Sequence, residues 1–273
     1  MKVFISADME GTAGVTDWEQ VLRREPEYVR FRRLMTEEVN AAILGALEGG
    51  AKEIVVSDSH GDMRNILIEE LHPQAQLISG SPKPYGMMQG IDPSFDAVFF
   101  TGYHAYAGTA NAILDHSYAS SLVRHIKLGN LLVGEAGLNA ALAGHFKVPV
   151  ALVTGDSTAV AQAKKLIPQV EAVAVKEAIG RLAARSYQPV EARRRIKEGA
   201  VRALKRIRDL KPFVIPKPVA LEIEWLFTAM ADRCMLIPGM IRVNPRAVAY
   251  KAKDAEQALN LTLACLVLAR STV

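Results

Sequence analysis

The ten residues KVFISADMEG at positions 2–11 combine an apolar run with two acids that follow it directly. Residues 2–7 are mostly apolar or β-favouring, so they predict a buried strand. Asp8 and Glu10 stand at the point where this strand ends. The first question that the sequence raises is therefore what two carboxylates do at the end of a buried strand.

The residues that follow complete a strand–helix–strand unit. Apolar residues between 28 and 47 recur with the spacing of an α-helix, Pro26 suits its first turn, and Gly49–Gly50 suit its end. Residues 53–58, EIVVSD, predict a second buried strand. Two strands joined by one helix lie parallel in the same sheet. The predicted fold class is therefore α/β, a mainly parallel sheet flanked by helices.

The same pattern continues to about residue 175 and then changes. The further elements predicted in the first part are a strand at 96–101, a hairpin in 126–134 that turns at Gly129–Asn130, a helix at 135–146 and a strand at 149–156. In the second part we expect a helical, basic segment at 176–211, strands at 218–225 and 243–252, and a helix at 253–270. The expected domains are an α/β metal-binding catalytic domain at 1–175 and a smaller α+β region at 176–273, which is a candidate for oligomerisation.

Composition excludes several classes of protein. The 273 residues are half apolar, enough for a large core, and the formal charge of +4 does not by itself indicate a nucleic-acid partner. Cys234 and Cys265 stand singly and match no zinc or disulfide spacing. The longest apolar stretch, 259–269, is too short to cross a bilayer, and acids interrupt the N-terminal run too early for a signal peptide. We therefore expect a cytoplasmic protein with no membrane partner.

Polar side chains follow several of the predicted strands. In parallel α/β sheets, ligands bind beyond the carboxyl ends of the strands. The residues at such positions are Asp8, Glu10, His60, His104, Glu135 and Asp156. Imidazole with carboxylate favours zinc, with manganese, cobalt or iron as alternatives, and the set suffices for two ions that share a bridging carboxylate. The blander alternative is that these acids cap helices and these histidines are structural, as we expect for His72, His125 and His145.

Several short motifs occur in an order that resembles a known family. They are DMEG at 8–11, TEE at 36–38, DSH at 58–60, LHP at 71–73, GYHA at 102–105, HS at 116–117 and VGEAGLNA at 133–140. LISG at 77–80, LIP at 166–168 and IPG at 237–239 extend the likeness over most of the chain. Together these motifs resemble the D-aminopeptidases associated with dipeptide transport.

The resemblance implies an activity, a cofactor and a site. Enzymes of this family form ring-shaped homo-oligomers (decamers), hold two zinc ions per subunit, and release N-terminal D-amino acids, notably D-alanine, from short peptides. Carried over motif by motif, the metal ligands are Asp8, Glu10, His60, His104 and Glu135, with Asp8 as the bridge. His116, in the HS motif, corresponds to the family's catalytic residue, and it could act either by proton transfer or by direct attack. No motif reports the chirality of the substrate, because a pocket selects it.

A different class of enzyme offers an alternative. DMEGTAG at 8–14 also resembles the DxDGT opening of haloacid-dehalogenase-type phosphatases, in which the first acid, here Asp8, attacks phosphorus. TGD at 154–156 resembles their later metal motif. That interpretation leaves His60, His104 and Glu135 without a role, whereas the peptidase interpretation uses all three.

The basic segment at 181–211 offers a non-catalytic alternative, the binding of RNA or of an acidic partner. It carries eleven Lys or Arg against three acids. Its interleaved Ala, Leu and Ile favour an amphipathic helix with a solvated basic face, and it holds little aromatic surface on which bases could stack. The sequence therefore favours a structural role for this segment and predicts no nucleic-acid partner.

Overall fold

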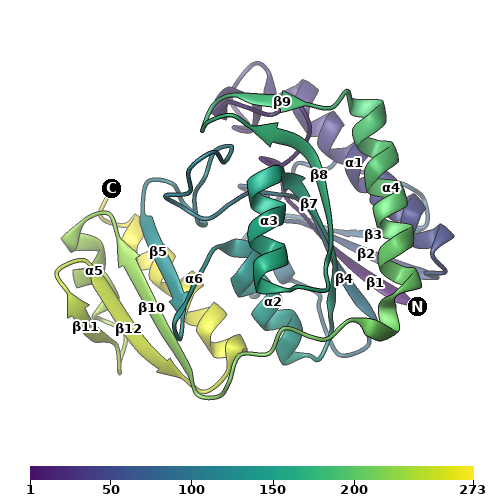
Figure 1. Ribbon diagram of the computed structural model, residues 1–273. Helices are drawn as coiled ribbons and strands as arrows, with labels where there is room; N and C mark the ends of the chain where they lie inside the picture. The colour runs from purple at the N-terminus through teal and green to yellow at the C-terminus, as the bar shows by residue number, and fades with distance from the viewer.

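The structure is a computed structural model that describes residues 1–273, and it contains two β-sheets flanked by helices (Figure 1). The larger sheet has seven strands in the order β3-β2-β1-β4-β7-β8-β9. These strands are β1 (Lys2–Ala7), β2 (Glu53–Asp58), β3 (Ala75–Ile78), β4 (Ala97–Tyr103), β7 (Val150–Asp156), β8 (Glu171–Ala178) and β9 (Ala184–Ser186). All pairings are parallel except that of β9 with β8. The predicted α/β fold class is confirmed.

Both faces of the larger sheet are buried. In β1, Ile5 belongs to one apolar core and Phe4 to the other, and Phe99 and Phe100 of β4 divide in the same way. Helices lie on both sides of the sheet (Figure 1), and they are α1 (Tyr28–Glu48) and α4 (Pro189–Lys205) on the first face, α2 (Glu135–His145) and α3 (Ser157–Leu166) on the second. Burial on both faces explains why these strands are continuous apolar runs rather than alternating ones.

The smaller sheet is antiparallel, in the order β11-β12-β10-β5-β6. Its strands are β5 (Val123–Leu128), β6 (Leu131–Val133), β10 (Val219–Trp225), β11 (Ile241–Asn244) and β12 (Ala247–Ala252). Two helices accompany it, α5 (Thr228–Cys234) and α6 (Ala255–Arg270), and α6 also packs against α2. Trp225 of β10 and Val98 of β4 lie in the same apolar core. The smaller sheet therefore shares an apolar core with one of the two faces of the larger sheet.

The two sheets do not divide the chain at a single point. The expected boundary at residue 175 falls inside β8, and α4 returns to the larger sheet beside α1. The hairpin β5-β6 leaves the first half of the chain and joins the smaller sheet. The division into domains 1–175 and 176–273 stays a prediction. The sheets do not divide at residue 175, because each of them contains strands from both sides of it.

Most of the predicted elements occur close to their predicted positions. The single strand predicted at 243–252 is instead part of two antiparallel strands, β11 and β12, and the segment 176–211 also differs. It begins with the last residues of β8 and the short strand β9, and it becomes helical only at Pro189. The structure also contains three single-turn helices, η1 (Trp18–Gln20), η2 (Gly86–Met88) and η3 (Ile207–Asp209). The helical prediction for 176–188 is wrong because pairing with β7 and β9 overrides the local preference of these residues.

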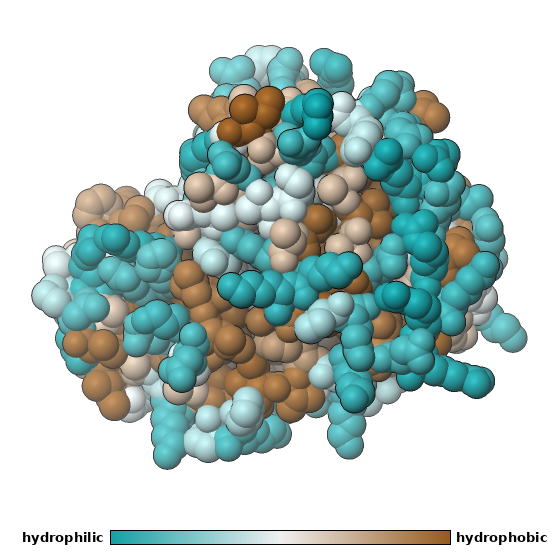
Figure 2. All heavy atoms as spheres, in the orientation of Figure 1, coloured by the Kyte–Doolittle hydropathy of each residue, from teal (hydrophilic) through white to brown (hydrophobic).

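The surface carries its charge unevenly. Figure 2 shows hydrophilic residues gathered over the side of the molecule where α4 lies. Many of the basic side chains there are paired with acids of the same chain, including Lys197 with Glu48 of α1 and Arg202 with Glu171 of β8. None of the helices combines the length and the apolar character that crossing a membrane requires.

Candidate metal centre

The five predicted ligands and His116 come together at the carboxyl edge of the larger sheet. Asp8 and Glu10 follow β1, His60 follows β2, and His104 follows β4. Glu135 is the first residue of α2, and His116 lies in the long connection between β4 and β5. All six side chains are buried, although none belongs to an apolar core. Parallel strand ends meet at one edge, which is why residues so far apart in sequence converge.

Two groups of three residues share Asp8. The first triad is Asp8, Glu10 and His60, and the second triad is Asp8, His104 and Glu135. In the first, His60 Nδ1 lies 3.3 Å from Asp8 Oδ1 and 3.0 Å from Glu10 Oε2. In the second, His104 Nε2 lies 3.5 Å from Asp8 Oδ2 and 3.3 Å from Glu135 Oε1. The two oxygens of one carboxylate thus face two separate triads.

The three imidazoles of the site are oriented in the same way. One ring nitrogen of each lies within hydrogen-bonding distance of a main-chain carbonyl: His60 Nε2 at 2.8 Å from Val21 O, His104 Nδ1 at 3.0 Å from Ala105 O, and His116 Nδ1 at 2.8 Å from Leu114 O. A nitrogen that donates to a carbonyl carries a proton, so in a neutral ring, as in a metal-bound one, the other nitrogen presents its lone pair. In all three rings that other nitrogen faces the carboxylates. Histidines that bind metals in proteins are typically held in this way.

Buried charge at this site calls for a cation. Burial and then the neighbouring Glu10 raise the pKa of the Asp8 carboxyl to about 8. Burial alone would lower the pKa of His60 and His104, but the carboxylates beside them hold both pKa values well above the usual one. Asp8 Oδ2 and His104 Nε2 are buried without a hydrogen-bond partner. Carboxylate oxygens and imidazole nitrogens are zinc ligands, so the residues present fit divalent zinc in both triads.

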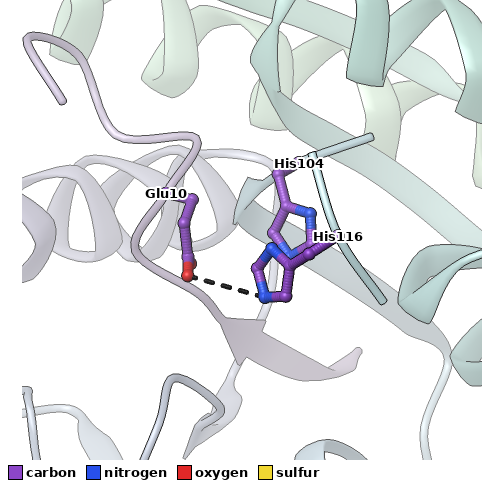
Figure 3. Close-up of side chains that lie close together, drawn as sticks. All are labelled: Glu10, His104 and His116. Carbon is purple, nitrogen blue, oxygen red and sulfur yellow. Dashed lines mark ion pairs between the residues drawn. The ribbon is translucent and has the colours of Figure 1, made fainter. Parts of the chain in front are cut away.

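His116 belongs to neither of these two triads, but its side chain lies close enough to Glu10 and His104 for the three to form a third possible metal-binding group. Its ring stacks on that of His104 with centroids 3.9 Å apart and planes inclined by 11° (Figure 3). Its Nε2 lies 3.8 Å from Glu10 Oε1 and 3.7 Å from Glu135 Oε1. Burial and the neighbouring His104 lower its pKa. The lowered pKa favours the neutral form of His116, in which the Nε2 lone pair would face the carboxylates.

Supporting residues to which the sequence motifs assign no individual role surround the six. Tyr103 Oη lies 2.7 Å from Ser6 Oγ and accepts a hydrogen bond of 2.9 Å from Asn139 Nδ2, beneath the site. The Trp18 ring meets that of His116 edge-on at 5.4 Å, and the Arg181 guanidinium lies 5.7 Å from the Trp18 ring centre. These partners come from five different segments. Tyr103 and Asn139 stand in the GYHA and VGEAGLNA motifs, whereas no local pattern marks Ser6, Trp18 or Arg181.

Other polar residues singled out by the sequence lie outside the two triads. Asp156 caps α3, where its Oδ1 accepts hydrogen bonds from the main-chain N–H groups of Thr158 and Ala159. His145 pairs with Glu256 near the start of α6, and His125 lies on β5 of the smaller sheet. Asp156 therefore takes the capping role that was the alternative to metal binding.

A mainly parallel α/β sheet whose strand ends gather three carboxylates and three imidazoles defines a metal-dependent α/β enzyme. A sequence model described as D-aminopeptidase matches residues 1–264, and the chain belongs to this family. The chain is 40% identical to the D-aminopeptidase of Bacillus subtilis (strain 168) over 273 residues. This match covers 100% of this chain and 99% of the Bacillus protein.

A solved structure shows the same fold. It is the Zn-dependent D-aminopeptidase DppA from Bacillus subtilis, described as a self-compartmentalizing protease. The TM-score is 0.96 at 39% sequence identity, with 99% of this chain and 98% of that chain covered. The resemblance inferred from the short motifs is confirmed by both relatives.

Proposed function

We propose that this protein is a zinc-dependent D-aminopeptidase that removes N-terminal D-amino acids, such as D-alanine, from short peptides. Family membership and the zinc dependence of the solved relative support the reaction and the metal. The observation that carries a centre with two ions is the placement of Asp8, whose two oxygens face two triads. A single ion would leave one of these triads without a metal.

The residues divide between the two ions as the triads do. Asp8, Glu10 and His60 would hold one ion, and Asp8, His104 and Glu135 would hold the other. Zinc, when bound, lowers the pKa of a bound water toward neutrality and polarises the carbonyl of the peptide. The chain orients its ligands through the carbonyl contacts of the imidazoles and through Glu135 Oε1, which accepts a 2.5 Å hydrogen bond from the Tyr118 main-chain N–H.

His116 supplies the proton transfer that hydrolysis requires. Its Nε2 accepts the proton of the attacking water as the water oxygen bonds to the peptide carbonyl carbon. The same nitrogen then donates that proton to the amine nitrogen as the carbon–nitrogen bond breaks. A lowered pKa suits the first half of this cycle, because the imidazole begins neutral. Stacking on His104 and the contact with Leu114 O hold the ring in place for both halves.

Assembly and location belong to the same proposal. The solved relative is described as self-compartmentalizing, which supports a homo-oligomer here. We extend this to a ring-like decamer and to a role for the region 176–273 in its contacts. Ten copies of the 29.7 kDa chain would give a particle of about 297 kDa, which light scattering on the purified protein would detect. Cytoplasmic location stays a prediction of the sequence.

A comparison of two stereoisomers tests the proposed function. The purified protein is stripped with a chelator, reloaded with zinc, and assayed on D-Ala-D-Ala and on L-Ala-L-Ala. We expect two zinc ions per subunit, hydrolysis that is lost on stripping and regained on reloading, and a clear preference for the D-peptide. Equal turnover of both isomers would overturn the D-specificity, and full turnover by the stripped protein would overturn the metal dependence.

A further inference from the structure

The loop that follows β1, at residues 10–15, is held in place by a buried lysine of β8. Lys176 lies on β8 and its side chain is fully buried. Its Nζ donates hydrogen bonds to three main-chain carbonyls of this loop, at 2.6 Å to Glu10, 2.9 Å to Thr12 and 2.7 Å to Val15. An ammonium group has three N–H donors, so every donor of Lys176 is used on one short stretch of backbone.

Two further anchors hold the same loop on its other sides. The Gly11 main-chain N–H donates to Gly102 O at 2.7 Å, and the Ala13 main-chain N–H donates to Glu38 Oε1 at 2.8 Å. Gly11 is also wedged against β4, because a Cβ there would lie 2.2 Å from Tyr103 O. The loop thus contacts β4, α1 and β8, and Lys176 supplies the only side-chain ammonium that it binds.

Core packing alone does not account for a lysine at this position. Removing an ammonium from water is costly, and an apolar side chain would fill the interior of β8 without that cost. Burial lowers the pKa of Lys176 to about 8, against the opposing effect of the nearby carboxylates of Asp156, Glu38 and Glu10. The hydrogen bonds of Lys176 nevertheless go to main-chain carbonyls. The ammonium group of Lys176 therefore holds the main chain of the loop in place and does not form an ion pair.

We propose that Lys176 is a positioning residue of the metal centre, which fixes the main chain of residues 10–15 and thereby holds the Glu10 carboxylate against His60. This inference rests on the proposed role of Glu10 as a zinc ligand. The hydrogen bond to the Glu10 carbonyl acts on the same residue whose Oε2 lies 3.0 Å from His60 Nδ1. A shift of the loop would widen that distance directly.

The two triads share Asp8, but the contacts that hold Asp8 and Glu135 do not involve Lys176. The Asp8 main-chain N–H donates to Thr101 O at 2.8 Å, which ties Asp8 to β4, and Glu135 is held by α2 and the Tyr118 N–H. Neither contact passes through the loop 10–15. Loss of Lys176 should therefore weaken zinc binding at the first triad and spare the second, and residues that orient metal ligands typically contribute about 10- to 100-fold to metal affinity.

Zinc titration of the metal-free protein tests this inference. Lys176→Met keeps the length of the side chain and removes all three donors, while Leu221→Ala removes a buried side chain of β10, remote from the loop. With a competing chelator, we expect K176M to bind one zinc as the unmodified protein does and the other about 10- to 100-fold more weakly. We expect L221A to bind both normally, even though it unfolds at a lower temperature. A second readout is the visible spectrum of the cobalt-substituted protein, which should change for one bound equivalent only.

The outcomes separate the inference from the proposed function. If K176M binds both ions as the unmodified protein does, or loses affinity equally at both, the positioning role is wrong while the enzyme assignment stands. If the unmodified protein binds no zinc, the proposed function itself fails. Lys176→Gln, which retains an amide donor, replaces K176M if that variant does not fold, and it should show a smaller change of the same kind. Failure of both variants to fold would assign Lys176 to folding alone and overturn the inference.

Discussion

At the scale of single residues, the site depends on how buried charges are satisfied. Asp8 places one oxygen toward His60 and the other toward His104. Each imidazole turns one nitrogen to a backbone carbonyl and the other inward. Such an arrangement of buried acids and bases is costly unless cations or shared protons balance it. These buried charged groups lie at one edge of a sheet whose strands are otherwise mostly apolar.

His116→Ala should separate chemistry from metal binding. Because neither of the two triads that share Asp8 contains His116, we expect the variant to retain two zinc ions per subunit and to lose about 10²- to 10⁴-fold in kcat. Metal analysis and peptidase assays on the same preparation measure both quantities. His125→Ala, on β5, is the matched control and should keep its activity. Undiminished turnover by zinc-loaded H116A would refute the catalytic assignment.

Glu38 makes a prediction about pH. Burial raises the pKa of its carboxyl from 4.5 to about 7, so the folded protein binds a proton there more tightly than the unfolded chain does. The stability that this group contributes is complete below pH 4.5 and is lost as the pH rises to about 7. Glu38→Gln keeps an acceptor for the Ala13 N–H and does not titrate. From pH 5 to pH 7.5, its free energy of unfolding should therefore rise relative to the unmodified protein, by on the order of 1–3 kcal/mol.

Urea unfolding at the two pH values measures this difference. Glu19→Gln, at an exposed site, controls for the general effect of removing a negative charge. A stability difference between E38Q and the unmodified protein that stays constant from pH 5 to pH 7.5 would show that Glu38 titrates alike in both states.

At the scale of elements, the close approach of β1 and β4 brings Asp8 and His104 together. Gly11 lies where the loop after β1 crosses the end of β4, and an added Cβ would meet main-chain atoms of Tyr103 and Gly102 at 2.2–2.7 Å. Gly11→Ala should therefore lower the free energy of unfolding by about 1–3 kcal/mol and weaken zinc binding. Gly180→Ala, where nothing lies within 4 Å, is the control. A G11A protein with normal melting temperature and zinc affinity would contradict this account of the crossing.

The elements also show what a sequence can and cannot predict. β1, β2, β4 and β7 were predictable because parallel strands buried on both faces are short apolar runs between polar ends. The end of β8 could not be predicted as strand, because Lys176 interrupts the apolar pattern and basic residues follow it. Only the tertiary structure shows that this lysine points inward, toward a loop more than 160 residues away in the sequence.

The basic stretch at 181–211 illustrates the same limit. Its sequence fits either a solvated basic helix or a surface for acidic partners. In the structure, Arg194 and Arg195 pair with Glu191 of the same helix, and others pair with acids of α1 and β8. Intramolecular pairing leaves less of the charge free for a nucleic acid than the count of basic residues suggests.

At the scale of the whole molecule, the site is assembled from segments that local patterns cannot connect. The sequence could indicate that Asp8, Glu10, His60 and His104 follow strands, and parallel topology then places them at one edge. It could not indicate the distances between them, nor that the connection carrying His116 would fold back over His104. The hairpin β5-β6 likewise belongs by sequence to the first half of the chain. In the structure, β5 pairs with β10, which lies more than 90 residues later in the sequence.

The central claim is that two zinc ions flank the Asp8 carboxylate. Diffraction from crystals of the zinc-loaded protein, recorded at the zinc absorption edge, tests it most directly. We predict two anomalous peaks per subunit, about 3.5–4 Å apart, one within each triad and one on each side of Asp8. A single peak, or peaks that lie away from His60 and His104, would contradict the account.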